Sequence, residues 1–584
     1  MQPPGKSVKN IRESTVTRRG LLAGGAATVA VAAGAARAAS HAFELEADVV
    51  VVGTGSAGST AALFAHEAGA KVLMVDKGAY HGGTSSKSGG EVWIPNHEWL
   101  RRKGLADERD DFLRYVVRCS FPVGYDASSP TFGAPPRIFE LLETFYGHGS
   151  LMVEGLGRMK ALRTQMLVIN GGSLQDYYSQ LPEDKRTQFR ILATVPRVPD
   201  GSFGGDEMMG QLAEAVGARG IPVHLRHEAT ALIRNGHGEV IGVEVSDPGK
   251  RRIRIGARRG VVFASGGYAH NKDLLQNFQA APVFGACAAP TATGDFIGMS
   301  SAVGAKLGNT GGAWRGQVVL DDAIRYRAIP ADAFMIFADS YMNVNRFGVR
   351  CCNERRSYHD KCKSHYVWDE TRAEYPNLLQ FAIYDQRSAE MYGGPMPIPP
   401  YPEGADYVIR GETIGELARA IDARLEKFSS HTGGLRLDTA FAATLQKTIA
   451  RFNAFAESGK DLDYGRGDHD LDRSFSLPPA KTSWPANDKP NPLLYPFQSK
   501  GPYFAIILAP GVLDTNGGPV IDSSARVLDT ADRPIGGLFG AGNCIASPAQ
   551  DAYWGAGCTL ALAMTFGMIA GQSAAKAKAR ELRA

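Results

Sequence analysis

Three glycines and one carboxylate near the start of the chain have the types and the spacing of a dinucleotide-binding site. Gly53, Gly55 and Gly58 come just after an apolar run over residues 47–51, and Asp76 stands 18 residues after Gly58. In a Gly-x-Gly-x-x-Gly turn, the glycines permit a tight turn, a close approach of backbone to pyrophosphate, and close packing of a helix on a strand. The helix N-terminus then faces the diphosphate, and the acid can hydrogen-bond a ribose 2′-hydroxyl.

Two strands and one helix are needed to hold these residues in place. The sequence predicts a buried parallel strand over 47–51, an Ala-rich helix after the glycine turn, and a second strand over 71–75 that leads into Asp76. Glycine spacing alone is weak evidence in a chain with 68 glycines. Here the strand, the helix, the second strand and the acid follow one another in the required order, so we predict a dinucleotide site rather than a Gly-rich turn without function.

A second run of small residues lies just beyond Asp76 and carries a resemblance to a known family. The run comprises Gly82, Gly83, Thr84, Ser85, Ser88, Gly89 and Gly90. It resembles the flavoproteins of the fumarate reductase and succinate dehydrogenase superfamily, in which such a run lies against the flavin. The resemblance implies FAD as the cofactor. It also implies non-covalent binding, because Gly83 fills the position of the flavin-linked histidine of succinate dehydrogenases, and His81 lies two residues upstream.

The resemblance and the order of elements together predict an α/β fold: a glutathione-reductase-type Rossmann FAD-binding domain with an inserted α+β substrate (cap) domain. The FAD-binding domain is expected over 42–325 and again over 498–584. The stretch 326–497 is loop-rich and lacks the βαβ rhythm, so we expect the cap there. Residues 344–354 resemble the superfamily's "N-x-x-G-x-R-F-x-N-E" motif in this region.

The resemblance also implies cofactor contacts along the whole chain. A hairpin is expected around residues 231–245, and an apolar helix over 560–570 is expected to point its N-terminus at the flavin. The residues predicted to contact FAD are Gly53, Gly55, Ser56, Ala57, Gly58, Asp76, Lys77, Gly83, Thr84, Ser85, Ser88, Gly89, Gly90, Ala231, Ala264, Ser265, Gly266, Asp295, Gly542, Asn543, Cys558 and Leu560.

Two loops distinguish the substrate classes of this superfamily. Four-carbon dicarboxylate reductases carry a histidine in one loop and an arginine in another, and these two residues clamp substrate carboxylates. The matching loops here are 513–518 and 551–557, and they contain neither residue. Tyr553 occupies the arginine position. A fumarate or succinate substrate would therefore lack its counter-ions.

The loop 553–557 instead resembles the "Y-x-G-x-G" loop of 3-ketosteroid Δ1-dehydrogenases. By this resemblance, the Tyr553 hydroxyl and the Gly557 amide bind the ketone oxygen and stabilise enolate charge. Tyr358 takes the α-proton, and either Tyr177 or Tyr178 is its hydrogen-bond partner and lowers its pKa. The implied reaction introduces an α,β double bond into a cyclic ketone, with transfer of the β-hydride to N5 of FAD.

Two other functions remain as alternatives. One is a periplasmic, fumarate-reductase-like enone or enoate reductase, which would run the electron flow in reverse. The other is a flavin-carrying electron-transfer module without a substrate of its own. The size of the ketone is also open: if Trp93 and Trp554 narrow the cavity, a single-ring ketone such as cyclohexanone is favoured. If both indoles are core residues, a four-ring steroid is equally compatible.

The N-terminal segment predicts export. Arg18 and Arg19, a weakly apolar run, and the sequence Ala-Arg-Ala at 36–38 resemble a Tat signal peptide over residues 1–38, with a membrane anchor as the alternative. We therefore expect a periplasmic protein with no stable membrane span after signal removal. No second nucleotide motif is visible, so an external electron acceptor, a quinone or a cytochrome, is expected in place of NAD(P)H.

Composition excludes several other partners. A net charge of +4 over 584 residues gives no indication of nucleic-acid binding. Seven cysteines without a Cys-x-x-Cys pair predict neither a disulfide framework nor attached haem. The cysteines and histidines between residues 351 and 365 do not have the spacing of a zinc finger, so we predict no metal.

Overall fold

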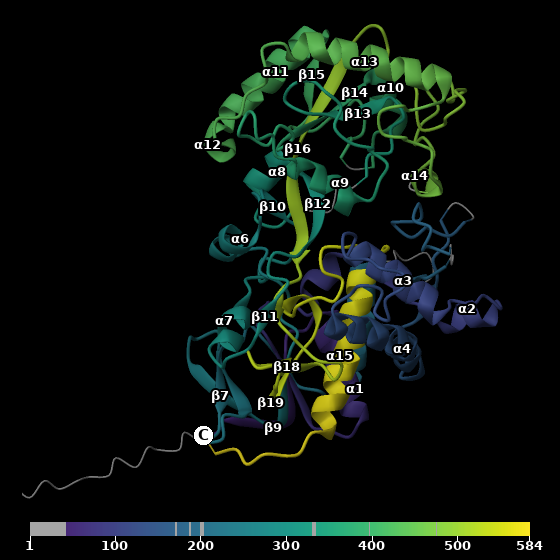
Figure 1. Cartoon of the computed structure of the whole chain (residues 1–584). Coiled ribbons are helices and arrows are strands. Elements are labelled where there is room, and N and C mark those ends of the chain that lie inside the picture. The colour runs from purple at the N-terminus through teal and green to yellow at the C-terminus, as the bar shows by residue number, and fades with distance from the viewer. Residues whose placement is uncertain are drawn as a thin grey trace, which may run out of the picture. The chain divides into compact units, whose positions relative to one another are not determined.

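The computed structural model describes residues 43–169, 172–185, 189–198, 204–329, 335–395, 397–474 and 476–583. The predicted signal peptide over 1–38 lies outside these residues. The described chain is a mixed helix and sheet fold (Figure 1).

The predicted strand, helix and strand at the start of the chain are confirmed. β1 (Leu45–Val52) leads through the glycine turn into α1 (Ser56–Glu67), and β2 (Val72–Asp76) returns parallel to β1. Residues 49–52 of β1 are four buried valines, a composition that suits a strand covered on both faces. This unit therefore places the glycine turn and Asp76 together at the carboxyl ends of two neighbouring strands.

The first sheet has eight strands and is completed by the far end of the chain. Its order is β18-β19-β9-β1-β2-β6, and β7 and β8 form a hairpin attached to β9. β9 and β19 run parallel to β1, which extends the parallel part of the sheet. The bounds are β6 (Val223–Leu225), β7 (Glu228–Arg234), β8 (Val240–Ser246), β9 (Arg252–Phe263), β18 (Arg526–Leu528) and β19 (Pro534–Gly540).

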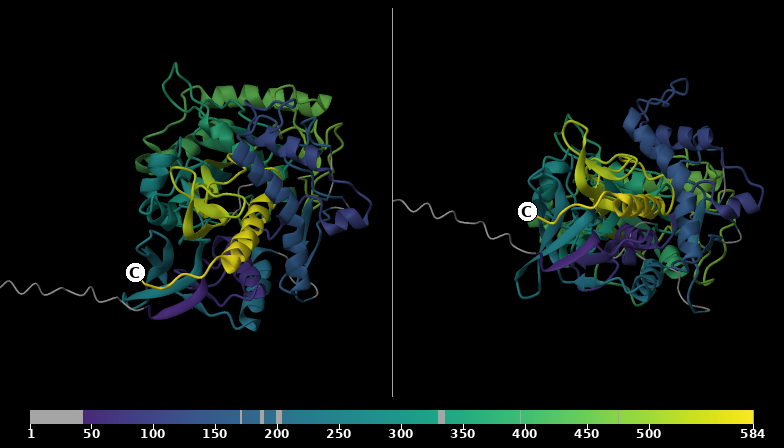
Figure 2. Two further views of the ribbon diagram at one scale, coloured as in Figure 1. Left: turned by 60° about the horizontal axis from the view of Figure 1, so that its bottom comes forward. Right: turned by 90° about the horizontal axis from the view of Figure 1, so that it is seen from below.

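The helix α15 (Cys558–Lys576) packs lengthwise on α1 and beside α4 (Pro136–Arg158) (Figure 2). Glycines make the close approach to α1 possible. A Cβ at Gly567 would lie 2.4 Å from the Ala57 carbonyl oxygen, and one at Gly571 would lie 2.2 Å from that of Ala61. Within the described chain, α15 is the one helix that is long and apolar enough to cross a membrane, but 83% of its most apolar window is buried inside the protein. This burial is typical of a core helix.

A second sheet of six strands is organised by one long strand, β16 (Tyr503–Thr515), which pairs with four others. The helices α11 (Ile414–Lys427) and α13 (Phe441–Ser458) cover it at the top of Figure 1. β10, β12 and β16 lie outside the predicted cap boundaries of 326–497, although all three belong to this sheet. The domain division itself stays a prediction. The other strands are β10 (Gly285–Ala286), β12 (Ala313–Val319), β13 (Tyr341–Val344), β14 (Gln380–Asp385) and β15 (Ile409–Gly411).

Shorter elements connect and flank the two sheets. Their bounds are β3 (Val92–Trp93), α2 (Glu98–Arg102), α3 (Arg109–Ser120), β4 (Thr164–Met166), β5 (Ile191–Thr194), α5 (Gly205–Ala218), α6 (Lys272–Phe278), α7 (Asp295–Ser301), β11 (Leu307–Gly308), α8 (Leu320–Arg325), α9 (Tyr358–Lys363), α10 (Gln386–Tyr392), α12 (Ser429–Thr432), α14 (Asp470–Ser474) and β17 (Gly518–Pro519).

Candidate active site

A cavity of about 420 Å³ is lined by residues from both sheets and from both ends of the chain. Most of the residues that the sequence assigned to the cofactor or to catalysis line it. They are Gly53, Gly55, Ser56, Ala57, Asp76, Lys77, Gly83, Thr84, Ser85, Ser88, Gly89, Ala264, Ser265, Gly266, Asp295, Gly542, Asn543, Leu560, Tyr177, Tyr358, Tyr553 and Gly557.

Five of the assigned residues do not line this cavity. Gly58 and Gly90 lie behind it, where a Cβ would meet the carbonyl oxygens of Gly53 and Gly204 at 2.0 and 2.4 Å. Cys558 is a buried residue in the first turn of α15.

The other two are Ala231 and Tyr178. Ala231 lies on β7, and Ala229, two residues earlier, lines the cavity in its place. Tyr178 points elsewhere, because its hydroxyl donates a hydrogen bond to Asp360 Oδ1 at 3.2 Å.

The turn between β1 and α1 has the form needed to hold a pyrophosphate. Gly53 has φ +107°, and a Cβ there would lie 2.3 Å from the Ala264 carbonyl oxygen, so only glycine fits without rearrangement. Gly55 is the N-cap of α1 and gives it no side-chain cap, while the Ser56 amide donates to Ser85 Oγ at 3.1 Å. The amides and the positive end of α1 therefore face the cavity, where they can bind an anionic phosphate.

The carboxyl group of Asp76, which was predicted to bind the ribose, is held in place by hydrogen bonds. Its Oδ2 accepts hydrogen bonds from the amide and the hydroxyl of Thr54, both at 2.7 Å, and its Oδ1 accepts from the Gly78 amide at 2.6 Å. Nearby, Lys77 Nζ pairs with Asp295 Oδ2 at 2.5 Å. The hydrogen bonds from Thr54 and Gly78 fix the Asp76 carboxylate at the cavity wall, which suits it to accept a hydrogen bond from a ribose hydroxyl.

Three tyrosines from distant parts of the sequence meet in the cavity. Tyr177 and Tyr553 stack with ring centroids 5.4 Å apart, and Tyr358 meets both edge-on, at 5.5 Å from Tyr177 and 5.3 Å from Tyr553. The Tyr358 hydroxyl is hydrogen-bonded with those of Tyr177 and Tyr553. The sequence left open whether Tyr177 or Tyr178 accompanies Tyr358, and the structure places Tyr177 there.

The acidity of these phenols differs from the expectation. Burial raises the pKa of Tyr177, Tyr358 and Tyr553 well above 10, and the neighbouring tyrosines add to the effect. The expectation that Tyr177 or Tyr178 lowers the pKa of Tyr358 is wrong, because removal from water is the largest cause of the raised pKa and Tyr177 raises it further. At neutral pH all three hydroxyls are therefore protonated and able to donate hydrogen bonds.

The two tryptophans that could have narrowed the cavity and favoured a single-ring ketone lie in the core. Trp93 and Trp554 are fully buried, do not line the cavity, and pack on each other with centroids 5.8 Å apart. They therefore do not narrow the cavity, and this argument for a single-ring ketone is lost. Trp314 on β12, which the sequence analysis missed, lines the cavity and meets the Tyr553 ring edge-on at 5.4 Å.

These core tryptophans instead hold the segment that carries Tyr177. The Trp93 indole donates to Asp176 Oδ1 at 2.6 Å, and Arg190 Nη1 donates to Asp176 Oδ2 at 2.5 Å. The Tyr177 amide donates to the Trp554 carbonyl oxygen at 2.9 Å. Tyr177 is therefore tied through backbone to the loop that carries Tyr553.

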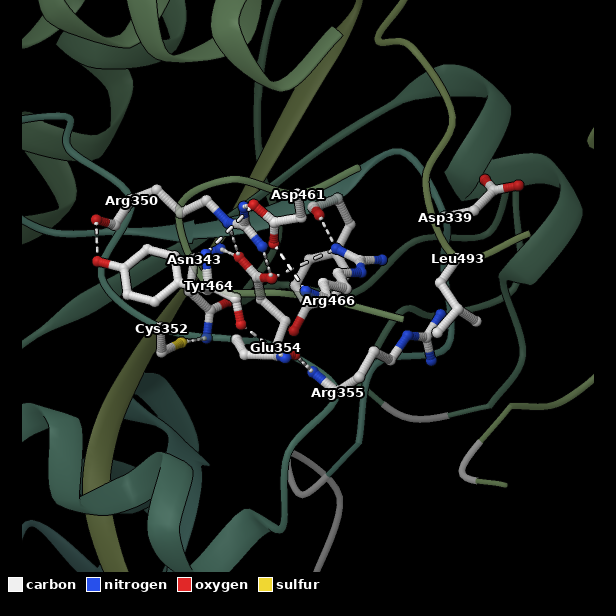
Figure 3. Close-up of polar contacts among 12 residues, drawn as sticks. Asp339, Asn343, Arg350, Cys352, Glu354, Arg355, Asp461, Tyr464, Arg466 and Leu493 are labelled. Carbon is white, nitrogen blue, oxygen red and sulfur yellow. Dashed lines mark hydrogen bonds and ion pairs between the residues drawn. The ribbon is translucent and has the colours of Figure 1, made fainter. Parts of the chain in front are cut away.

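A buried ion-pair cluster anchors the segment that leads to Tyr358 (Figure 3). Glu354 accepts from Arg350 Nε at 2.8 Å and Nη2 at 2.7 Å, and Arg466 Nη1 lies 3.4 Å from the same carboxylate. Arg350 Nη1 donates to Asp461 at 2.8 Å. Burial raises the pKa of Glu354, but the Arg350 charge and its hydrogen bonds outweigh burial and hold the pKa below its usual value. The ionised cluster fixes the chain four residues before Tyr358.

The histidine after Tyr358 joins α9 to its neighbours. His359 Nδ1 accepts a hydrogen bond from the Arg315 amide at 3.1 Å, and Nε2 lies 3.0 Å from the Asp551 carbonyl oxygen. Burial lowers the pKa of His359 to about 4, so the ring is neutral and Nε2 carries the proton that it donates. His359 belongs to the cysteine and histidine group considered for metal binding. Among the described residues, no group of three potential ligands could hold a metal ion.

Glu91 is an ionisable residue of the cavity that the sequence did not predict as part of the site. Glu91 follows Gly90 directly and lines the cavity with the tyrosines, and burial raises its pKa above the usual value. Glu91 could have been identified from the sequence, because an acidic residue directly after a run of small, uncharged residues is unusual at a flavin site.

Comparison with known proteins defines the class first. The FAD binding domain family model matches residues 48–560, and the chain belongs to this family. FAD is its cofactor, and the glycine turn, the end of α1 and Asp76 fit that group. The protein is an FAD-dependent oxidoreductase, and the resemblance drawn from its flavin-facing motifs is confirmed.

Particular relatives narrow the class. The chain is 30% identical to 4-oxocyclohexanecarboxylate 2-dehydrogenase of Sinomonas cyclohexanicum, with 90% of this chain and 92% of the relative covered. It is also 30% identical to 3-oxosteroid 1-dehydrogenase of Mycolicibacterium smegmatis, with coverage of 90% and 96%. The crystal structure of 3-ketosteroid Δ1-dehydrogenase from Sterolibacterium denitrificans in complex with 1,4-androstadiene-3,17-dione superposes with TM-score 0.75 at 26% identity, covering 91% of this chain and 99% of that one.

Proposed function

We propose that the protein dehydrogenates a cyclic ketone to its α,β-unsaturated product. The observation that carries the proposal is the meeting of Tyr177, Tyr358 and Tyr553 in the cavity of an FAD-binding fold. The relatives named above act on ketosteroids and on a cyclohexanone carboxylate, which supports a cyclic ketone as the substrate class. FAD, when bound, supplies the acceptor for the hydride.

In this proposal, the ketone oxygen lies between the Tyr553 hydroxyl and the Gly557 amide. Gly557 is the N-cap of α15, with φ +88°, so the positive end of a long helix lies behind the oxygen. A protonated Tyr553 is a suitable donor, because burial keeps its pKa high. Two donors aimed at one oxygen stabilise the charge that develops as the α-carbon loses its proton.

Tyr358 is the group proposed to receive the α-proton. Because its own pKa is raised, Tyr358 takes that proton only after its hydroxyl hydrogen has been lost to solvent, so that the phenolate receives the α-proton and returns to the neutral phenol. Tyr177 is its hydrogen-bonded partner in the cavity. The apolar residues Leu167, Ile169 and Leu174 line the same cavity and keep water from the reacting carbons.

The charges at the cavity argue against the alternative of dicarboxylate reduction. No arginine is among the described residues that line it. Lys77 is paired with Asp295, and Lys87 Nζ donates to the Ile329 carbonyl oxygen at 3.3 Å. A substrate with two carboxylates would thus meet no arginine clamp among these residues, whereas a ketone needs none.

For the architecture, we propose the glutathione-reductase-type arrangement, with a Rossmann FAD-binding domain and an inserted cap. The parallel order β2-β1-β9-β19 around the glycine turn supports the Rossmann FAD-binding domain.

For the location, we propose a Tat-exported periplasmic enzyme that passes electrons to a quinone or a cytochrome, and the twin arginine at 18–19 supports the export. Fractionation of cells that express the full chain and its Arg18→Lys, Arg19→Lys variant tests the export.

The experiment that tests the function is anaerobic mixing of the purified holoenzyme with a panel of ketones. The visible absorption of oxidised flavin should be lost with saturated cyclic ketones, and the enone product should accumulate. If only enones reoxidise the reduced protein and no saturated ketone bleaches it, the enzyme is a reductase. If neither happens, the protein is a flavin carrier and the proposal is wrong.

A further inference from the structure

Tyr115, on α3, forms a hydrogen-bonded bridge behind the proposed active site. Its ring is fully buried and does not line the cavity. Its hydroxyl donates to the Trp554 carbonyl oxygen at 2.8 Å and accepts from the Tyr178 amide at 3.3 Å. Trp554 directly follows Tyr553 in the chain, and Tyr178 directly follows Tyr177. One phenolic oxygen therefore joins the backbone of the two segments that carry these cavity tyrosines.

The Tyr115 side chain is held in one orientation. Burial is the largest of the causes that raise its pKa well above 10, so the hydroxyl keeps the proton that it donates to Trp554. The Arg190 guanidinium carbon lies 5.6 Å from the ring centroid, and the Trp93 ring centroid lies 6.3 Å from it. Both of these neighbours also donate hydrogen bonds to Asp176. The bridge is therefore supported by a packed, hydrogen-bonded frame.

The bridge adds to two direct hydrogen bonds between the same segments. The Tyr177 amide donates to the Trp554 carbonyl oxygen at 2.9 Å, and the Tyr553 amide lies a longer 3.5 Å from the Tyr178 hydroxyl. Loss of the Tyr115 hydroxyl would take from the buried Tyr178 amide the acceptor that it has here, which is costly in a site shielded from water. The two segments could then shift relative to each other.

We propose that Tyr115 is a positioning residue, whose hydroxyl sets the placement of the Tyr177 and Tyr553 side chains in the cavity. This inference rests on the proposed function, in which Tyr553 binds the ketone oxygen and Tyr177 is the hydrogen-bonded partner of Tyr358. Tyr115 acts through the backbone of the two segments, because it does not line the cavity itself. A misplacement of about 1 Å in reacting groups can slow a reaction by about 10²-fold.

A double-mutant cycle on flavin reduction tests the inference. The rate with a saturated cyclic ketone is measured by stopped flow in wild type, Tyr115→Phe, Tyr553→Phe and the double variant. Tyr115→Phe keeps the ring and removes only the bridging oxygen. Tyr407→Phe is the matched control, since the Tyr407 hydroxyl also donates to a carbonyl oxygen, that of Pro397 at 2.9 Å, and this buried tyrosine lies outside the cavity lining. FAD content and thermal unfolding are measured for each protein.

Tyr115→Phe is expected to slow flavin reduction by about 10- to 100-fold at saturating ketone. The same change in the Tyr553→Phe background should have a much smaller effect, because the hydroxyl that the bridge positions is then absent. Tyr407→Phe should keep the wild-type rate. A wild-type rate in Tyr115→Phe, or losses that simply multiply in the double variant, would overturn the inference.

A second variant keeps the test decisive if Tyr115→Phe loses its FAD. Replacement of Tyr115 by 4-aminophenylalanine leaves an N–H donor within reach of the Trp554 carbonyl oxygen, so most of the wild-type rate should be retained. A folded, FAD-loaded protein of this kind that is as slow as Tyr553→Phe would also overturn the inference. Failure of the proposed function shows separately, as the absence of flavin bleaching in wild type with every ketone.

Discussion

His359 Nε2 donates a hydrogen bond to the main-chain oxygen of Asp551 at 3.0 Å, which joins the helix of Tyr358 to the loop of Tyr553. The neighbouring Tyr358 and Tyr553 rings meet at 5.3 Å, and His359 itself lies 5.8 Å from the Tyr553 ring. One neutral imidazole therefore holds the proposed base and the proposed ketone donor together, although it does not itself line the cavity.

Replacement of His359 by phenylalanine should separate the two tyrosines without removing either. We expect kcat to fall by about 10- to 100-fold, because small misplacements of reacting groups cost rates of this order. His359→Asn, which can still donate to Asp551, should recover part of the loss. Steady-state kinetics at saturating ketone measure the effect, and equal rates for all three proteins would contradict a positioning role.

The same histidine gives the folded state a pH dependence. Its pKa is about 4 in the folded protein, below the unfolded value of about 6.5, so the unfolded chain binds more protons between these limits. Stability is thus full above pH 6.5 and falls as the pH drops toward 4. The buried His365, with a pKa also lowered to about 4, acts in the same sense. Urea unfolding from pH 7 to 4.5 should show a shallower loss in His359→Asn than in wild type; identical slopes would refute the assignment.

A methyl group at Gly53 should remove the cofactor from the protein. Gly53→Ala places a Cβ 2.3 Å from the Ala264 carbonyl oxygen at a positive φ, which distorts the turn that faces the pyrophosphate. The flavin-to-protein ratio after purification is expected to fall below about one tenth of wild type. Gly69→Ala is the matched control, since Gly69 also has a positive φ but has open space around its Cβ position. Full flavin content in Gly53→Ala would count against the site.

Loss of the Glu354 charge should destabilise the whole protein more than it alters chemistry. Glu354→Gln leaves Arg350 and Arg466 buried without their carboxylate, and breaking a buried pair in this way costs about 3–5 kcal/mol. Chemical denaturation measures the loss. The exposed pair of Arg436 and Glu426 provides a control, Glu426→Gln, whose expected effect is below about 1 kcal/mol. Comparable losses in both variants would show that the cluster is not the anchor described here.

Local sequence motifs predicted the first strand, helix and strand of the fold, whereas the composition of the site depends on the tertiary structure. The valine run, the glycine turn and Asp76 predicted β1, α1 and β2 because strand, turn and helix preferences act over short distances. Tyr177 could not be separated from Tyr178 in sequence, since which side chain faces a cavity depends on the contact with Trp554 across the fold. Trp93 and Trp554 were ambiguous for the same reason.

The acidity of the tyrosines also required the structure. Motifs place Tyr358 beside a phenol, but they do not report how much water the fold removes, and removal of water is the largest cause of the raised pKa. Glu91 was visible in the sequence, but only the structure shows that it lines the cavity with the tyrosines.

The most direct test of the account is the rate of flavin reduction by a saturated cyclic ketone in the Tyr553→Phe variant. Loss of one donor to a developing oxyanion costs about 10²- to 10³-fold in rate, so a fall of this size is expected with FAD content unchanged. Tyr384→Phe, a buried tyrosine of β14 outside the cavity, should keep the wild-type rate. A Tyr553→Phe enzyme that reduces its flavin as fast as wild type would contradict the central claim that this hydroxyl holds the ketone oxygen.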